Sequence, residues 1–202
     1  MTANYERVEI RSRPEWRDWL RTHHDRSSGV WLVTFHKSVP RWHVPYSEVV
    51  DEAIAFGWVD SQPRTLDDQR SQLLVTPRRP TSSWSRANKQ RVERLERAGL
   101  MTEAGRRAVA LAQANGAWTA LDQVEQLVEP DDLQVALLRH AGARENWDGF
   151  PRSAKRAILE WIASAKKPET RGRRITETAR LAADDIRANQ PRQPQRRRPS
   201  SR

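Results

Sequence analysis

The sequence predicts an α+β protein: a small antiparallel sheet with helices in the N-terminal part, a helical C-terminal half and a disordered basic tail. Three observations support this class. The first third alternates between short β-branched or aromatic runs and amphipathic helical patterns, and nearly every segment after Ser83 has helical periodicity. From Arg187 onward the chain has six arginines, no acidic residue and little to bury. The predicted parts are an α+β domain over 1–126, a helical region over 127–187 and the tail over 188–202.

Three short strands and two helices are predicted in the first part of the chain. The strands are VEI (8–10), VWLVTFHK (30–37) and QLLVTPR (72–78). Pro14 opens the first helix, whose apolar face carries Trp16, Trp19 and Leu20. Ser47 is predicted to cap the second helix, EVVDEAIAF, which ends at Gly57 and leaves Asp60 in a turn just beyond it.

Cap and breaker residues set the limits of the helices predicted after residue 82. SRANKQRVERLERAG ends at Gly99, and Thr102 caps the next helix, which ends at Gly116. Pro130 and Pro151 each open a predicted helix, and Pro168 interrupts the pattern before the last one, ETRGRRITETARLAADDIR.

The composition limits the kinds of protein that this chain can be. It has no cysteine, which excludes disulfides and thiolate metal sites and fits a reducing, cytoplasmic location. The N-terminus has no apolar core of a signal peptide, and no stretch approaches the roughly 20 apolar residues that span a bilayer. Because six of its ten net positive charges come from Arg187 and the five arginines after it, residues 1–186 carry only +4. The tail either binds polyanions loosely through counterion release or is a solvated terminus.

One position on the helix that follows Ser83 is unusual. Its apolar stripe is Trp84, Val92 and Leu95, and Asn88 lies on that stripe, where leucine would stabilise more. An unpaired buried amide costs about 1–3 kcal/mol, so Asn88 must have a partner. Either it completes a capping box with Ser85, or it faces a polar cavity.

The second interpretation places a small-ligand pocket around the start of this helix. Two arginines before a helix N-terminus, with hydroxyls and free N–H groups, form a competent anion site, and a few polar groups in an aromatic wall are typical of ligand pockets. Asp60 would hold Arg78. The plainer interpretations are a structural ion pair, N-capping serines and core tryptophans. The predicted ligand-binding residues are Trp58, Asp60, Arg78, Arg79, Ser82, Trp84, Ser85 and Asn88.

No other pattern predicts chemistry. His36 and His43 lack metal-ligand spacing, and the chain has no phosphate-binding loop, nucleophile elbow or HExxH motif. We therefore predict no catalytic residue, no metal and no cofactor.

Several segments together resemble a known family. They are EWRDWL and GVWL, followed in order by FGWVDS (56–61), PRRPTSSWSRAN (77–88), GLMTEAG (99–105) and AKKPETRGRRI (165–175). The chain resembles the YdeI/OmpD-associated family, also described as bacteriocin-protection proteins, over about residues 8 to 187. The resemblance implies a bacterial, soluble α+β protein with a part in tolerance of antimicrobial peptides, and it implies no particular reaction. The chain departs from the family pattern at VPRWHV (39–44), where the family has a lysine-rich turn.

We therefore expect a cytoplasmic, non-enzymatic protein, monomeric or weakly dimeric, that binds a small anionic ligand in stress or antimicrobial-peptide tolerance. Direct capture of the peptides is disfavoured because they and the protein are both cationic. Two alternatives stay open. A nucleic-acid-binding protein would use Lys167, Arg171 and Arg174 on the last helix together with the tail. An enzyme would use Asp60 as a general base.

Overall fold

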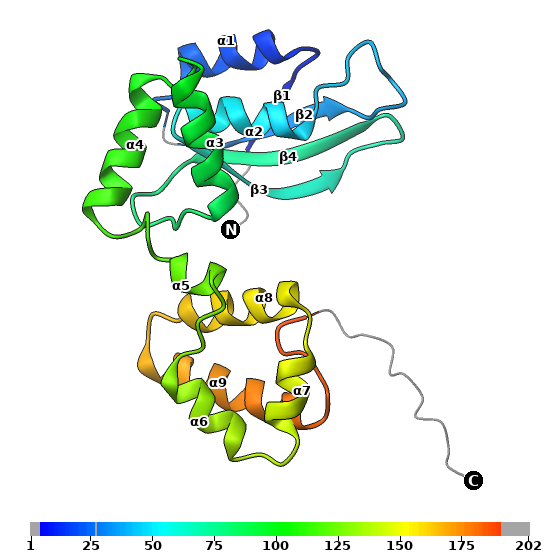
Figure 1. Cartoon of the computed structure of the whole chain (residues 1–202). Coiled ribbons are helices and arrows are strands. Elements are labelled where there is room, and N and C mark those ends of the chain that lie inside the picture. Colours follow the sequence, from blue (N-terminus) through cyan, green and yellow to red (C-terminus); the bar gives the residue numbers. More distant parts are fainter. Residues whose placement is uncertain (1–4, 27, 191–202) are drawn as a thin grey trace. The chain divides into compact units, whose positions relative to one another are not determined.

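The computed structural model describes residues 5–26 and 28–190, and the chain divides into two compact units, residues 1–120 and 121–202. Unit 1 contains a four-stranded sheet and four helices, whereas the elements of unit 2 are all helical (Figure 1). The predicted α+β class is thus confirmed. None of the described helices combines the length and apolarity that a membrane crossing requires.

The sheet of unit 1 has the strand order β1-β2-β4-β3. Its strands are β1 (Glu6–Glu9), β2 (Val30–Phe35), β3 (Trp58–Thr65) and β4 (Arg70–Pro77). β4 pairs antiparallel with β2, which fits the predicted antiparallel sheet, and also with β3, whereas β1 pairs with β2 in parallel, so the sheet is mixed. The parallel pair arises because a helix connects β1 to β2 and returns the chain to the same end of the sheet.

Strand β3 was not expected from the sequence, which placed Asp60 in a turn. β3 lies at one edge of the sheet, and its pairing register shifts between Asp60 and Pro63. An edge position and a bulge are the places where a strand tolerates proline. This strand was therefore not predicted, because Pro63 and the polar residues around it do not show the sequence pattern of a strand.

Four helices complete unit 1. They are α1 (Arg13–His23), α2 (Tyr46–Ala55), α3 (Arg86–Arg97) and α4 (Glu103–Ala114). Thr102 caps α4 as predicted, accepting from the N–H of Gly105. The predicted cap of α2 is wrong: Pro45 is its N-cap residue, and Ser47 lies within the first turn. Proline fixes the φ angle at this boundary, so α2 begins without a side-chain cap.

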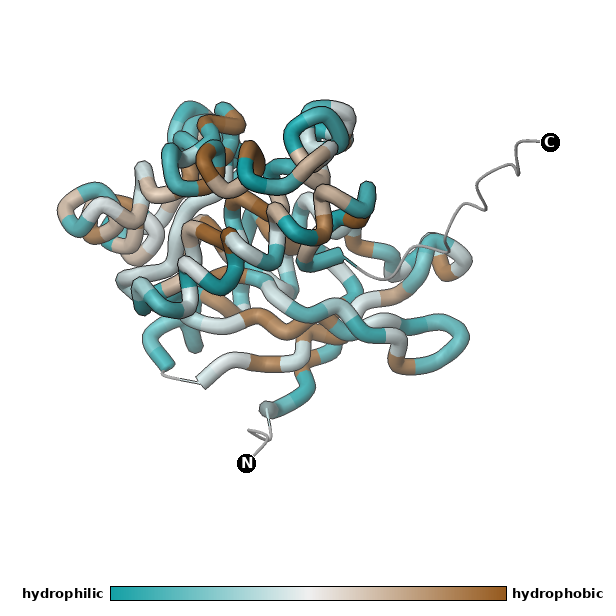
Figure 2. Tube along the Cα trace, turned by 90° about the horizontal axis from the view of Figure 1, so that it is seen from below, coloured by the Kyte–Doolittle hydropathy of each residue, from teal (hydrophilic) through white to brown (hydrophobic). Residues whose placement is uncertain are grey.

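The core of unit 1 lies between the helices and one face of the sheet. Val30, Leu32, Leu73 and Val75 cluster with buried residues of α1, α2 and α3. Their neighbours along each strand point to the opposite face because side chains alternate in a strand. Figure 2 shows hydrophobic stretches interrupted by hydrophilic positions along the strands.

Unit 2 is a helical bundle with its own core. Its elements are α5 (Asp122–Glu125), α6 (Asp131–Leu138), α7 (Ala143–Gly149), α8 (Arg152–Ala163) and α9 (Pro168–Ala183). The sequence predicted α6, α8 and α9 but missed the short helices α5 and α7. Ala188 is 1% exposed within this core, so the packed chain extends past residue 187, where we expected the tail to begin. The rest of the predicted tail, from residue 191, lies outside the described residues.

Candidate functional site

Arg78, which directly follows β4, is the centre of the predicted site. Its backbone N–H donates to the carbonyl of Gly57 at 3.0 Å, where α2 gives way to β3. Its side chain turns toward the loop before α3: Nη1 donates to the Ser83 carbonyl at 3.0 Å. The guanidinium carbon lies 3.8 Å from the centre of the Trp84 ring. The structure thus brings together two of the predicted residues, Arg78 and Trp84, in a cation–π stack.

Three donors in this stack are buried and have no hydrogen-bond partner among the described residues. They are Nε and Nη2 of Arg78 and Nε1 of Trp84. The planar guanidinium presents its N–H groups as a fork that matches the two oxygens of a carboxylate or phosphate. Leaving a buried donor unpaired costs about 1–3 kcal/mol. Arg78 therefore presents two neighbouring N–H groups that are closed off from solvent in this conformation and have no acceptor among the described residues.

The charge of Arg78 is influenced by burial and by Asp60. Burial lowers the pKa of Arg78 to about 10, and the nearby carboxylate of Asp60 opposes this change. The expected Asp60–Arg78 ion pair does not form among the described residues, because Asp60 Oδ2 accepts instead from the Tyr46 hydroxyl at 2.6 Å. Burial and this carboxylate together raise the pKa of Tyr46 to about 12. At neutral pH Arg78 remains charged, and Asp60 supports it only at longer range.

The serines and Asn88 have mostly structural contacts here. Ser85 is the N-cap of α3, and its hydroxyl accepts from the backbone N–H of Asn88 at 3.3 Å, which is one of the two bonds of the predicted capping box. Ser82 donates its backbone N–H to the carbonyl of Arg79 at 2.9 Å. Ser82, Ser85 and Asn88 are half-buried, whereas Arg79 is exposed. These residues lie on the same loop and first helical turn as Trp84.

Trp58 faces a different neighbourhood from the one predicted. Its Nε1 donates to the His24 carbonyl at 3.0 Å, and its ring meets the edge of Trp19 at 5.8 Å. Trp84 packs instead against Trp118, with ring centres 5.2 Å apart. The ring contacts therefore assign Trp58 to the α1 side of the core and make Trp118 the aromatic partner of the Arg78–Trp84 stack.

The loop that carries the site is anchored by the end of α4, which the sequence did not reveal. Trp84 donates its backbone N–H to the Ala117 carbonyl at 3.3 Å. Asn115, the C-cap of α4, donates from Nδ2 to the Pro80 carbonyl at 2.9 Å. An asparagine next to Gly116 is a common helix end, so the sequence signalled the cap but not its contact with residue 80.

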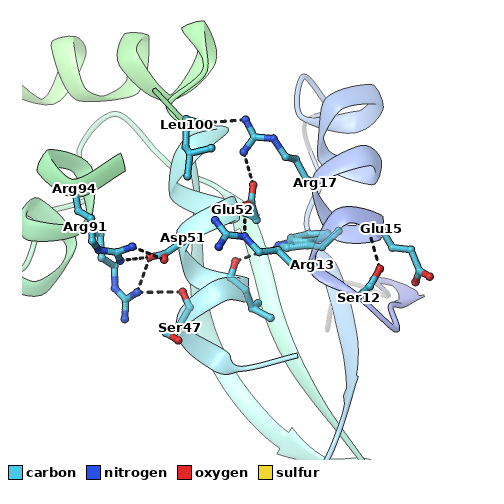
Figure 3. Close-up of polar contacts among 12 residues, drawn as sticks. Ser12, Arg13, Glu15, Arg17, Ser47, Asp51, Glu52, Arg91, Arg94 and Leu100 are labelled. Atoms are coloured by element: carbon cyan, nitrogen blue, oxygen red, sulfur yellow. Dashed lines mark hydrogen bonds and ion pairs between the residues drawn. The ribbon is translucent and has the colours of Figure 1, made fainter. Parts of the chain in front are cut away.

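The strongest ionic cluster of unit 1 was also missed. Asp51 and Glu52, adjacent on α2, are 3% and 1% exposed. Glu52 accepts from Nε of Arg13 and from Nη1 of Arg17, both at 2.6 Å (Figure 3). On the other side of α2, Asp51 accepts from Arg91 and Arg94 of α3.

This cluster ties α2 to its neighbouring helices. Burial acts to raise the pKa of Asp51, but the hydrogen bonds from Arg94 and Arg91 outweigh it and hold that pKa below its usual value. The available signal was spacing: arginines recur at i, i+4 in α1 (Arg13, Arg17) and at i, i+3 in α3 (Arg91, Arg94), on one side of each helix. We interpret the cluster as structural because each carboxylate is already satisfied by two guanidinium groups.

The predicted nucleic-acid residues of α9 are largely engaged within unit 2. Arg171 makes two hydrogen bonds to Asp132, from Nε and Nη2, both at 2.9 Å. Arg174 donates to the Trp161 carbonyl and, at 2.9 Å, to Ser164 Oγ, at the end of α8. Lys167 is exposed at the N-cap of α9. The three cations therefore do not form a uniformly free basic face.

A shallow hollow of about 500 Å³ lies in unit 1, apart from Arg78. Glu9, Arg11, Phe35 and the hairpin residues 67–70 line it. None of the predicted ligand-binding residues contributes to it.

Comparisons with known proteins divide the chain in a similar way. Residues 8–108 match the model of a domain of unknown function, DUF8412, which covers half of the chain. Residues 126–185 match the model described as Bacteriocin-protection, YdeI or OmpD-Associated. That match is shorter than the span of residues 8 to 187 over which the quoted segments suggested the resemblance. It includes one of those segments, AKKPETRGRRI. No curated protein and no solved structure matches the chain significantly. The N-terminal unit thus belongs to the DUF8412 family, and the C-terminal unit, through residues 126–185, to the bacteriocin-protection, YdeI or OmpD-associated family.

Proposed function

We propose that this protein is a cytoplasmic, non-enzymatic binding protein for a small anionic ligand, with a role in tolerance of stress or antimicrobial peptides. The proposal of an anionic ligand rests on Arg78, whose Nε and Nη2 donors are buried beside the Trp84 indole and have no hydrogen-bond partner among the described residues. A carboxylate or phosphate group would accept from both nitrogens. The role in tolerance rests on the family description alone.

Access to the fork requires a movement of the loop before α3. Nη1 of Arg78 is held by the Ser83 carbonyl, and the loop is fastened to α4 through the Pro80 and Ala117 contacts. Release of this loop would open the fork, and Ser82, Ser85 and Asn88 lie on it or just after it. Asp60 would support the positive charge of Arg78, and Arg79 would add charge from the surface.

The alternative functions have less support. Binding of nucleic acid through α9 would have to compete with the contacts of Arg171 and Arg174 inside unit 2. A general-base role for Asp60 would need its carboxylate to be free, yet the Tyr46 hydroxyl donates to it.

A thermal-shift titration of the full chain tests the ligand proposal. Phosphate, acetate, dicarboxylates and nucleotides would be compared on the wild type, Arg78→Lys and Arg86→Lys. Lysine keeps the charge but lacks the fork, so Arg78→Lys should lose a shift that Arg86→Lys, an exposed substitution at the start of α3, retains. A ligand at 100 times its Kd stabilises the folded state by about 2.7 kcal/mol, which gives a readily measured shift in Tm. The proposal is wrong if no anion shifts the Tm or if Arg78→Lys responds like the wild type.

A further inference from the structure

The face of the sheet turned away from the helices has no assigned role. Pairing register places Arg7, Trp31 and Leu74 side by side across three strands, and Val33, Gln72 and Arg64 side by side in an adjacent row. We call these six residues the open face. None of them belongs to the core cluster that the helices form with the other face of the sheet.

The open face combines a half-buried aromatic ring with arginines from both edge strands, and its Val33 and Gln72 are buried, at 3% and 8% exposed. Trp31 and Leu74, at its middle, are half-buried, whereas Arg7 and Arg64 are exposed. The guanidinium carbon of Arg64 lies 4.6 Å from the centre of the Trp31 ring. From the opposite edge, Arg7 Nε donates to Gln72 Oε1 at 3.3 Å.

A second aromatic group with arginines continues this surface beyond β2. Phe35, the last residue of β2, packs against Trp42 with ring centres 5.1 Å apart. Two guanidinium groups flank Trp42: that of Arg11 at 5.0 Å and that of Arg41 at 5.8 Å.

Two carboxylates near this surface, Glu9 and Asp67, are paired with arginines, and the exposed Asp68 lines the same hollow as they do. Glu9 pairs with Arg11 at 3.2 Å and with Arg70 at 2.7 Å, and Arg70 also pairs with Asp67 at 2.6 Å. Arg7, Arg41 and Arg64 remain as additional positive charge around the two rings. The charge and the aromatic rings together favour a polyanion that carries planar groups.

We propose that the open face and Trp42 bind single-stranded nucleic acid. Bases would stack on Trp31 and Trp42, and Arg7, Arg41 and Arg64 would contact phosphates. Arg64 is exposed on an edge strand. Its side chain would move off the Trp31 ring, so that a base stacks there, and would contact a phosphate of the nucleic acid. Stacking on aromatic side chains needs unpaired bases, and it tolerates any sequence because every base has a π face. This binding does not use Arg78 or α9.

Fluorescence anisotropy of the full chain with a labelled 12-nucleotide poly(dT) or poly(U) strand tests the proposal. Trp31→Ala should weaken binding by about tenfold, as loss of one stacked base predicts, and Trp31→Phe should retain most of it. Arg64→Gln should weaken binding less and lower the slope of log affinity against log salt by about 0.7. The matched control is Arg107→Gln, an exposed arginine on α4 of the same unit, which should bind like the wild type. Thermal unfolding establishes that each variant is folded.

Three results would overturn the proposal. They are no binding of single strands by the wild type, equal binding of a duplex of the same length, and unchanged affinity in both Trp31→Ala and Arg64→Gln. The last result would place the binding elsewhere on the chain, outside the open face. If Trp31→Ala failed to fold, the other two variants would test the proposal. Arg64→Gln should lower the slope of log affinity against log salt, and Trp31→Phe should retain most of the affinity.

Discussion

The guanidinium of Arg94 donates two hydrogen bonds to the carboxylate of Asp51, from Nη1 to Oδ2 at 2.9 Å and from Nη2 to Oδ1 at 2.8 Å. Arg91 adds a third, to Oδ1, at 2.7 Å. Because the aspartate is almost fully buried, water cannot replace a lost partner there. This one carboxylate therefore adds three hydrogen bonds to the apolar packing between α2 and α3.

Asp51→Asn should destabilise unit 1 markedly. The substitution removes the charge and places an amide N–H against two guanidinium groups. Breaking a buried ion pair costs about 3–5 kcal/mol, and we expect the lower end because the Arg94 side chain is 52% exposed. Urea unfolding followed by circular dichroism measures the change. Glu93→Gln, an exposed acid on α3, is the control and should stay within about 0.5 kcal/mol of the wild type.

The same carboxylate predicts how stability depends on pH. The pKa of Asp51 is lower in the folded protein than in the unfolded chain, so its contribution is fully present above the unfolded pKa of about 3.9 and is lost as pH falls through the folded value. The Tm should therefore decline below about pH 4. Asp51→Asn should start from a lower Tm and decline less steeply over the same range. An equally steep decline in the variant would contradict this account.

Gly105 should not tolerate a side chain. A Cβ at this position would lie 2.3 Å from the carbonyl oxygen of Ala55, where the start of α4 meets the end of α2. Gly105→Ala must push the two helices apart, and overpacking of this kind costs about 1–3 kcal/mol or more.

Gly172→Ala is the matched test of that prediction, since Gly172 also lies in a helix. A Cβ there meets no atom within 4 Å, so alanine should stabilise α9 by about 0.5–1 kcal/mol. If thermal unfolding shows that Gly105→Ala lowers the stability and Gly172→Ala raises it, the close approach at Ala55 is supported. A change of stability in the same direction for both variants would contradict it.

In unit 2, Glu129 should be the most sensitive acidic residue. Its carboxylate accepts from Nη1 of Arg144 at 2.6 Å and from Nε1 of the buried Trp147 at 2.7 Å. Glu129→Leu would leave the indole N–H without its acceptor and Arg144 with Asp148 as its remaining carboxylate partner, at a cost of about 1.5–3 kcal/mol. Glu129→Gln keeps an acceptor for Trp147 and should cost less. Near-ultraviolet circular dichroism and urea unfolding would separate the two variants. Equal losses of unfolding free energy would exclude a role for the hydrogen bond from Trp147 to Glu129.

Local signals in the sequence were enough to place most of the helices. Thr102 and the prolines at 130, 151 and 168 act within one turn of the chain, so their meaning does not depend on distant residues. Val30 to Phe35 likewise identified the central strand by its composition. The parallel pairing of β1 and the proline-containing strand β3 depend on neighbours in the sheet, which local patterns do not specify.

The site was harder to predict because its contacts cross long stretches of sequence. The capping bond between Ser85 and Asn88 follows from a spacing of three residues, and it was predicted. The turn of Arg78 onto Trp84 depends on a loop conformation that α4 holds in place. Asp51 resembled an ordinary surface acid until Arg91 and Arg94, 40 or more positions away, were brought to it.

The two strands that border the sheet also limit how copies of this protein can associate. β1 is only four residues long, and Pro63 together with the register shift interrupts β3. Neither border therefore presents a long, regular row of free peptide groups on which another chain could add a strand, which is how many proteins avoid edge-to-edge aggregation. Replacing Pro63 with threonine would restore a peptide N–H and a β-forming side chain to β3. It would thereby remove a safeguard against aggregation that costs the folded monomer little.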